Sequence, residues 1–291
     1  MRYRVTHTTT YAYEEAVSVS HSEARITPRR TPGQNPQRTQ LLVEPMPGAL
    51  VSDTDYFGNT VHFFSLEESH ERLTVTAVSD VDVDGVPTPA HGLTPAWESV
   101  PDMIRRDRTR AGVEAVGYVF QSPLVRYDAS IRAYADESFT PGRPVLDAAY
   151  ELTRRIYADF AYEPGSTSIF TPLSAVMQAR RGVCQDFAHL EIAMLRSLGL
   201  PARYVSGYLR TQPAPGRPRL TGADASHAWL SLYCPGFGYI DLDPTNGTIP
   251  NDEHVTVAWG RDFGDVSPLK GVILGGGAHD LSVSVDVAAV A

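Results

Sequence analysis

The first 85 residues alternate between apolar and polar side chains. The alternation is clear in residues 2–13, 39–45, 60–66 and 72–83, and Pro and Gly residues separate these stretches. A period of two is typical of β-strands with one buried face, and strands joined by short turns pair in antiparallel fashion. We therefore predict an antiparallel β-domain here, and we expect residues 7–10 (HTTT) to form a solvated strand face rather than a site.

Helical periodicity begins after residue 126. Residues 127–139 fit a short helix. From Pro144 onward, apolar side chains recur every three or four residues along one stripe: Val145, Ala149, Leu152, Ile156 and Phe160. Pro144 stands at the start of this helix, where proline is favoured. A shorter helix is predicted to follow, with Thr171 as its N-cap and Gly182 at its end.

The next helix carries a cysteine at its start. After Gly182, apolar residues again follow the helical period, and Gly199 and Pro201 supply the stop signal. Cys184 is therefore expected in the first turn, where free backbone N–H groups and the helix dipole favour a reactive thiolate. The alternative is equally weighted at this point, because most free cysteines are small, inert, buried side chains.

A hairpin is predicted over residues 225–247. Two β-prone runs flank a turn at residues 235–238, and alternation places His227 and Trp229 on one face. If Trp229 lies opposite Asp243, His227 is the diagonal neighbour of that carboxylate. Taken singly, His227 fits an ordinary strand histidine, and Asp243 before Pro244 fits a turn-initiating residue.

Together, Cys184, His227 and Asp243 form the set that a cysteine nucleophile needs. An imidazole accepts the thiol proton, and a carboxylate orients the ring and stabilises its charged form. The backbone N–H of Cys184 is a candidate donor to the oxyanion. Asp186 is expected to bond backbone N–H groups near the helix start.

Composition narrows the choice of partners. The 291 residues are 42% hydrophobic and 20% charged, which is typical of a globular protein, and no apolar run is long enough to span a bilayer. The N-terminal residues lack the apolar stretch of a signal peptide, which predicts a cytoplasmic location and no membrane partner. A net charge of -9 without a basic cluster argues against nucleic acid. The arginine-rich run 105–110 is interpreted as a connector or a solvated helix face.

The remaining cysteine and histidines suggest no further chemistry. Cys234, the second of only two cysteines, precedes the hairpin turn and is interpreted as structural. One disulfide with Cys184 is conceivable, but so low a count suits free thiols. The other early histidines are scattered without ligand spacing: His21, His62, His70 and His91. We expect no metal site and no cofactor.

Three blocks closely resemble bacterial transglutaminase-like proteins, a family that includes predicted cysteine proteases. The blocks are residues 182–209, 226–233 and 239–247, and the resemblance assigns Cys184 as nucleophile, His227 as base and Asp243 as orienting acid. The C-terminal block 260–271 and DYFGN at 55–59 resemble further features of this subgroup. Tyr239 departs from the tryptophan that the family has there.

The resemblance implies an α+β fold. An N-terminal antiparallel β-domain (1–112) would precede a papain-like, transglutaminase-like core (113–262), with the nucleophile at a helix N-terminus packed on an antiparallel sheet. Residues 263–291 would return to the β-domain through an alternating strand, and the Pro- and Gly-rich segment 211–224 is predicted to be a mobile loop near the cleft.

The expected activity is cysteine-dependent acyl transfer to water, acting on a peptide or protein substrate. The alternatives are a protein-glutamine transglutaminase with an amine acceptor, a non-catalytic interaction module and, less favoured, a zinc hydrolase that uses the same three residues. The oligomeric state is not predicted.

Overall fold

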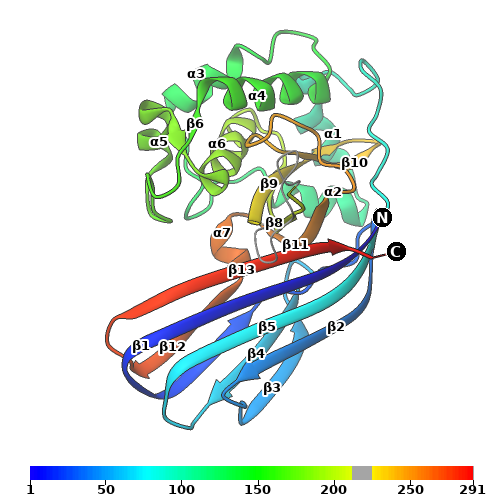
Figure 1. Cartoon of the computed structure of the whole chain (residues 1–291). Coiled ribbons are helices and arrows are strands. Elements are labelled where there is room, and N and C mark those ends of the chain that lie inside the picture. Colours follow the sequence, from blue (N-terminus) through cyan, green and yellow to red (C-terminus); the bar gives the residue numbers. More distant parts are fainter. Residues whose placement is uncertain (212–224, 291) are drawn as a thin grey trace, which may run out of the picture.

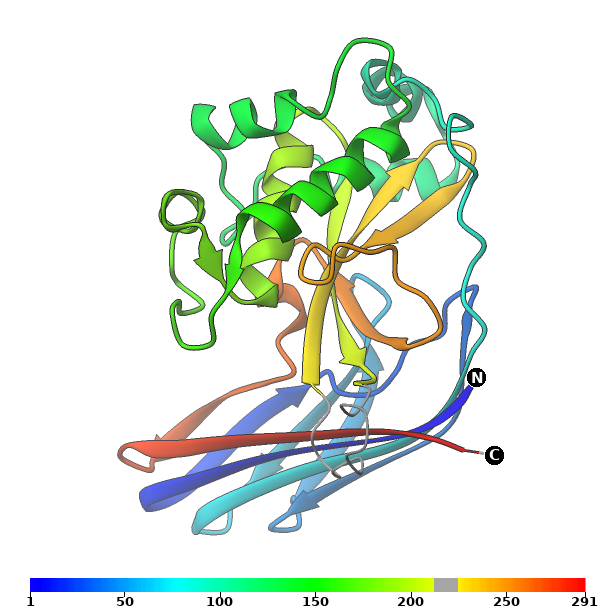
Figure 2. The same cartoon turned by 45° about the horizontal axis from the view of Figure 1, so that its top comes forward.

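The computed structural model describes residues 1–211 and 225–290, so nearly all of the predicted loop before His227 lies outside the described residues. A β-rich part lies beneath a part in which helices surround a smaller sheet, and both described ends of the chain lie on the β-rich part (Figure 1). Figure 2 shows the smaller sheet standing between the helices and the β-rich part.

The β-rich part is organised around one long strand. Its seven strands are β1 (Arg2–Ala24), β2 (Gln34–Glu44), β3 (Ala49–Thr54), β4 (Thr60–Leu66), β5 (His70–Val83), β12 (Leu269–Gly275) and β13 (His279–Ala289). The first half of β1 pairs with β5 and β13, and its second half pairs with β4 and β12, all antiparallel. The predicted antiparallel β-domain is confirmed, and its C-terminal strands come from the other end of the chain.

The expectation of a solvated face at residues 7–10 is wrong for His7 and Thr9, which are buried. The hydroxyl of Tyr208, in the smaller sheet, donates to the Ile26 carbonyl at 3.0 Å and lies 2.9 Å from His7 Nδ1. His7 Nε2 lies 2.8 Å from the Thr9 hydroxyl. Burial lowers the pKa of His7 to about 4, so the ring is neutral and joins the two parts as a polar contact.

The second part contains seven helices among the described residues: α1 (Val100–Arg106), α2 (Arg110–Val116), α3 (Ala129–Asp136), α4 (Val145–Asp159), α5 (Leu173–Ala179), α6 (Cys184–Ser197) and α7 (Phe263–Val266), with a 3-10 turn, η1 (Trp97–Ser99), before α1. Its strands are β8 (Ala202–Leu209), β9 (Ala225–Cys234), β10 (Gly238–Leu242) and β11 (His254–Gly260), with a short parallel pair, β6 (Ala161–Tyr162) and β7 (Arg181–Gly182). The four longer strands form an antiparallel sheet in the order β10-β9-β8-β11. The α6 helix packs on β9 and β8, and α3, α4 and α5 pack against α6.

The predicted helices at α3, α4 and α6 are confirmed, but α5 differs at both ends. Its N-cap is Pro172, without a side-chain cap, rather than Thr171. It ends at Ala179, because Arg180 adopts a left-handed conformation with φ 54° and the next two residues form β7. The arginine-rich run spans the end of α1 and the start of α2, and α2 contains residue 112, where the domain boundary was expected.

The part of the chain that the structure describes has neither a membrane-spanning helix nor a disulfide. None of its helices is both long and apolar enough to cross a membrane. Cys184 and Cys234 are both free thiols.

Candidate active site

The first turn of α6 presents Cys184 at a half-buried position. The backbone N–H of Val183 donates to Asp186 Oδ2 at 2.8 Å, and the Thr167 hydroxyl donates to the same oxygen at 2.6 Å. Asp186 therefore has the structural role predicted for it, and it also holds the loop before α5. Gly182 is required at this place, because a Cβ there would lie 2.7 Å from Asp186 Oδ2.

The β9–β10 hairpin positions the histidine and the aspartate. Its register pairs Leu242 with Leu230 at the end of β10, and Asp243 follows directly and bridges to Thr248. His227 Nε2 lies 2.8 Å from Asp243 Oδ2, and both side chains are buried. The hairpin thus converts the sequence spacing into a direct imidazole–carboxylate contact.

Asp243 is held as a carboxylate by its partners. Its Oδ1 accepts the backbone N–H groups of Thr245 at 3.0 Å and Asn246 at 3.2 Å. Its Oδ2 lies 3.1 Å from His254 Nε2 and accepts the Asn246 side-chain amide at 2.7 Å, in addition to contacting His227. Burial acts to raise the pKa of Asp243, but these hydrogen bonds and the charge of His227 outweigh it and hold the pKa well below its ordinary value. The turn-forming role and the role beside His227 therefore coexist in one side chain.

His227 connects the carboxylate to the thiol. Because Asp243 engages Nε2, the nitrogen left for Cys184 is Nδ1. Burial acts to lower the pKa of His227, but the hydrogen bonds and charges of Asp243 and Cys184 overcome it and raise the pKa to about 10. The structure thus brings Cys184, His227 and Asp243 together, with the imidazole in the middle.

His254 was not anticipated from the sequence. It belongs to β11, which pairs with β8 rather than with the hairpin, so only the strand order brings it to Asp243. One ligand atom from each of His227, Asp243 and His254 lies within 4.8 Å of the others, a grouping that a metal ion could use. Each of these three atoms already has a hydrogen-bond partner inside the group.

Apolar side chains and a cavity border the first turn of α6. The cavity has a volume of about 280 Å³ and touches Gln185 and Asp186, with Ile169 and the exposed ring of Phe170 among its walls. Tyr162 stands near the thiol: burial first, and then the charge of Cys184, raises the pKa of Tyr162. The surface next to the first turn of α6 is therefore partly apolar.

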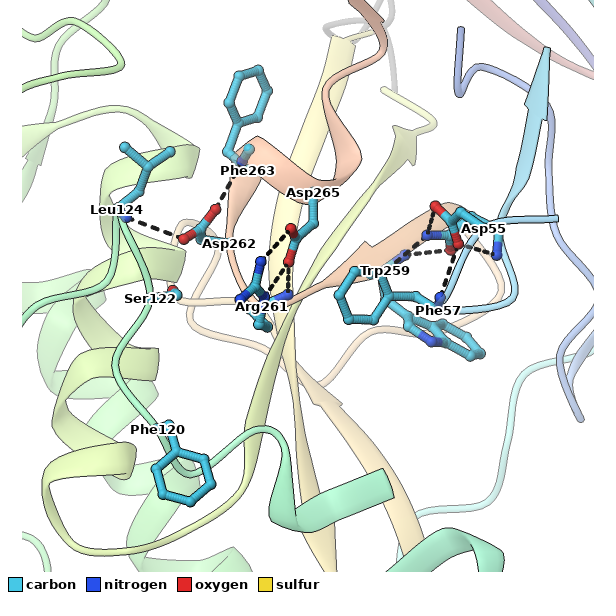
Figure 3. Close-up of polar contacts among 12 residues, drawn as sticks. Asp55, Phe57, Phe120, Ser122, Leu124, Trp259, Arg261, Asp262, Phe263 and Asp265 are labelled. Carbon is cyan, nitrogen blue, oxygen red and sulfur yellow. Dashed lines mark hydrogen bonds and ion pairs between the residues drawn. The ribbon is translucent and has the colours of Figure 1, made fainter. Parts of the chain in front are cut away.

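The two outlying blocks are structural in this fold (Figure 3). In the C-terminal block, Arg261 pairs with Asp265 at 2.9 Å, and Asp262 caps α7 while it accepts the Leu124 N–H at 3.1 Å. In DYFGN, the Asp55 carboxylate accepts backbone N–H groups of its own turn, including that of Phe57 at 3.0 Å. These contacts brace the loops around the sheet and lie outside the thiol site.

Comparison with known proteins agrees with this architecture. The family model described as the bacterial transglutaminase-like N-terminal region matches residues 3–82, and the model described as the transglutaminase-like superfamily matches residues 132–244. An uncharacterized protein of Mycobacterium tuberculosis is 40% identical over 294 residues, which is 98% of this chain and 92% of the relative. An uncharacterized protein of Mycobacterium leprae is 35% identical over 100% of this chain and 99% of its own.

Two further similarities concern named proteins. A "putative cysteine protease" from Cytophaga hutchinsonii matches with a TM-score of 0.77 and 23% identity, covering 99% of this chain and 90% of that one, and shares the fold. A protein-glutamine gamma-glutamyltransferase of Pseudomonas aeruginosa is 32% identical over 123 residues, which is 41% of this chain and 18% of that protein. On the family models and the full-length relatives, the chain belongs to the bacterial transglutaminase-like superfamily.

Proposed function

We propose that the protein is a cysteine-dependent acyl-transfer enzyme that hydrolyses peptide or amide bonds, with Cys184, His227 and Asp243 as its triad. The observation that carries the proposal is the position of His227, between a buried ionised carboxylate and a thiol at a helix start. A strand histidine kept for packing has no need of both partners.

In the first half of the reaction, Cys184 Sγ attacks the carbonyl carbon of the substrate. His227 Nδ1 takes the thiol proton, and Asp243 stabilises the resulting imidazolium. The backbone N–H of Cys184, which has no intrahelical acceptor at this position, faces the forming oxyanion. The tetrahedral species collapses to a thioester, and the leaving amine departs with the proton from His227.

In the second half, an acceptor cleaves the thioester. With water, His227 removes a proton while the oxygen attacks the carbonyl, and the products are a carboxylic acid and the free thiol. With a primary amine the product is a new amide. Similarity to the protein-glutamine gamma-glutamyltransferase of Pseudomonas aeruginosa favours this second outcome as the alternative function, protein-glutamine transamidation.

The proposed substrate is a peptide or protein, because exposed apolar side chains on which a chain can pack lie near the first turn of α6: Tyr162 is near the thiol, and Ile169 and Phe170 line the adjoining cavity. The net charge of -9 argues against nucleic acid. The triad mechanism needs no metal and no cofactor. We also propose the domain limits 1–112, 113–262 and 263–291 and a cytoplasmic location.

The test uses a glutamine-containing peptide with and without a fluorescent primary amine. Ammonia release without amine incorporation supports the hydrolase, and amine incorporation in preference to hydrolysis supports the transglutaminase. Cys184→Ala should abolish both activities, while Cys234→Ala serves as the matched control and should retain them. Peptide cleavage is followed in parallel by mass spectrometry.

Two other functions have distinct signatures. A non-catalytic interaction module should leave Cys184 inert to every substrate and should lose stability in Cys184→Ala, whereas an active site often gains stability when its nucleophile is removed. A zinc hydrolase should lose activity with a chelator and regain it with Zn²⁺. Activity that persists in the chelator excludes that possibility.

A further inference from the structure

A second cavity lies between the β-rich part and the smaller sheet. It has a volume of about 450 Å³, and its walls come from the start of β2, the end of β5, α2 and all four strands of the smaller sheet. Neither Cys184 nor His227 is among its lining residues, whereas His254 is. The cavity is therefore separate from the thiol site, and His254 lines it while contacting the Asp243 carboxylate at 3.1 Å.

Arg203 is the positively charged side chain that lines this cavity. Its guanidinium lies between two aromatic rings, with the guanidinium carbon 3.7 Å from the Tyr239 ring centroid and 3.5 Å from that of Trp259. The residue is only 8% exposed, and its Nε has no hydrogen-bond partner. No described carboxylate forms an ion pair with it. Stacking covers the two faces of the guanidinium and leaves its in-plane N–H edge free, which is the edge that binds carboxylates.

The platform beneath Arg203 is fixed in place. The backbone N–H of Trp259 donates to Asn59 Oδ1 at 2.9 Å, and the Asn59 amide donates to the Trp259 carbonyl at 2.9 Å. Figure 3 shows Trp259 held in this way beside the Asp55 turn. On the same indole, the Arg29 guanidinium carbon lies 3.1 Å from the ring centroid. Two cations therefore share one ring, and burial together with the charge of Arg203 lowers the pKa of Arg29 to about 9.

Two other polar atoms at the cavity lack partners. The Tyr239 hydroxyl and His254 Nδ1 are buried, line the cavity through their residues and have no hydrogen bond. Buried polar atoms of this kind usually have a partner, so each calls for one. Arg203 and the Tyr239 hydroxyl are donors for an anion, whereas His254 Nδ1 is an acceptor in the neutral ring, because Asp243 accepts from Nε2.

The rim of the cavity limits the charge of that anion. Glu114 and Asp241 also line it, and the Asp241 oxygens are already bonded to Trp229 Nε1 and the Ser231 hydroxyl. Two carboxylates in the wall oppose a dianion such as phosphate more strongly than a single negative charge. The rest of the wall is largely apolar, with Val83, Val86, Phe237 and Ile249.

We propose that this cavity binds a small molecule with one carboxylate, held by the in-plane edge of Arg203 and the Tyr239 hydroxyl, with an apolar body against the valine and isoleucine walls. This site is independent of the proposed acyl-transfer activity, because its ligand does not touch the thiol.

The test is calorimetric titration of the full chain with three monocarboxylates: acetate, hexanoate and 3-phenylpropionate. We expect 3-phenylpropionate to bind with a Kd of about 1 mM or tighter, and its neutral amide, 3-phenylpropionamide, to bind at least about tenfold more weakly. Inorganic phosphate is titrated in parallel. Tighter binding of phosphate than of every carboxylate overturns the proposal, as does failure of all three carboxylates to bind.

Variants test the residues. Arg203→Gln should raise the Kd about 10- to 100-fold, since it removes a charge-assisted hydrogen-bond donor. Tyr239→Phe keeps the stacked ring and removes only the hydroxyl, so it should weaken binding several-fold even if Arg203→Gln folds poorly. Glu114→Gln removes a carboxylate that repels the anion, so it should lower the Kd. The change should be small, because the Glu114 carboxylate is exposed to solvent. Arg105→Gln changes an exposed arginine of α1. It is the matched control and should leave the Kd unchanged. Unchanged binding in both Arg203→Gln and Tyr239→Phe overturns the assignment.

Discussion

The two free thiols of this protein occupy contrasting surroundings. Cys184 begins α6, is half-buried and contacts a histidine that carries a carboxylate behind it. Cys234 ends β9, is fully buried in the hydrophobic core, and burial raises its pKa to about 12. The sequence offers the same side chain twice, and the fold supplies charge-stabilising partners to only one of the two.

Two buried carboxyl groups repeat the contrast. Asp243 has five hydrogen-bond contacts and is ionised. Glu191, inside α6, is fully buried, and burial first of all raises its pKa to about 8. The Thr153 hydroxyl donates to Glu191 Oε1 at 2.7 Å, and this one hydrogen bond does not offset the burial. In this protein, burial alone therefore does not decide whether a carboxyl group is charged. The number of its hydrogen-bond partners decides it.

The largest expected effect concerns alkylation of the thiols. Even a cysteine with an ordinary pKa near 8.5 has about 10³-fold more thiolate at neutral pH than one with a pKa of about 12. We therefore expect iodoacetamide to modify Cys184 at least about 10³-fold faster than Cys234, as measured peptide by peptide by mass spectrometry. Equal rates would remove the contrast and, with it, the nucleophile assignment.

The second expected effect isolates the imidazole. His227→Ala should slow alkylation of Cys184 at pH 5 to 6 by about 10²-fold, because the positive ring no longer stabilises the thiolate. The two proteins should converge at alkaline pH, where the thiol ionises unaided. His91→Ala is the matched control, since His91 is an exposed histidine far along the chain. Loss of rate by the same factor at every pH would instead indicate a structural defect.

A smaller effect is expected from the carboxylate. Asp243→Asn removes the charge of Asp243 and leaves only Cys184 to oppose the effect of burial, so the pKa of His227 should fall well below about 10. NMR titration of the ring measures this directly. Alkylation of Cys184 at pH 6 should slow about tenfold. A ring that still titrates above pH 8 in this variant would show that Asp243 is not its main partner.

The same pair predicts a stability window. The raised pKa of His227 contributes stability that is complete below pH 6.5 and is lost as the pH rises through about 10. The lowered pKa of Asp243 contributes stability that is present above its ordinary value near 3.8 and is lost at lower pH. The free energy of unfolding, measured with urea, should therefore differ most between Asp243→Asn and the wild type between pH 3.8 and pH 6.5.

A further effect on stability concerns Glu191. Its folded pKa of about 8 exceeds the ordinary value of 4.5, so its contribution is complete below pH 4.5 and is lost as the pH rises through 8. Glu191→Gln removes this titration and should gain stability relative to the wild type by about 1 kcal/mol per pH unit across that range. Denaturant unfolding at pH 5, 6.5 and 8 measures the slope, and parallel curves for the two proteins would mean that Glu191 is already charged.

Local patterns in the sequence predicted the antiparallel strands and the helices α3, α4 and α6, but not the ends of α5. The alternation of residues 2–13 and 72–83 predicted strands, and the stripe after Pro144 predicted α4, because each period reports which side of an element faces a core. Alternation in the predicted hairpin placed His227 and Asp243 within reach of each other on one face, and His227 Nε2 lies 2.8 Å from Asp243 Oδ2. The predicted role of Asp186 at the start of α6 was likewise local, since its partner is three residues away.

Contacts between distant elements were decided only by the tertiary structure. His254 reaches Asp243 because β11 pairs with β8, and His7 is buried because β1 lies against Tyr208. The stack of Arg203 on Trp259 likewise joins two strands that do not neighbour each other in sequence. The sequence by itself determined the elements, the order of the thiol, imidazole and carboxylate, and the helix start that presents Cys184. Only the packing of the two parts decided which polar groups share a buried space, because side-chain periodicity records that a face is covered but not which residue covers it.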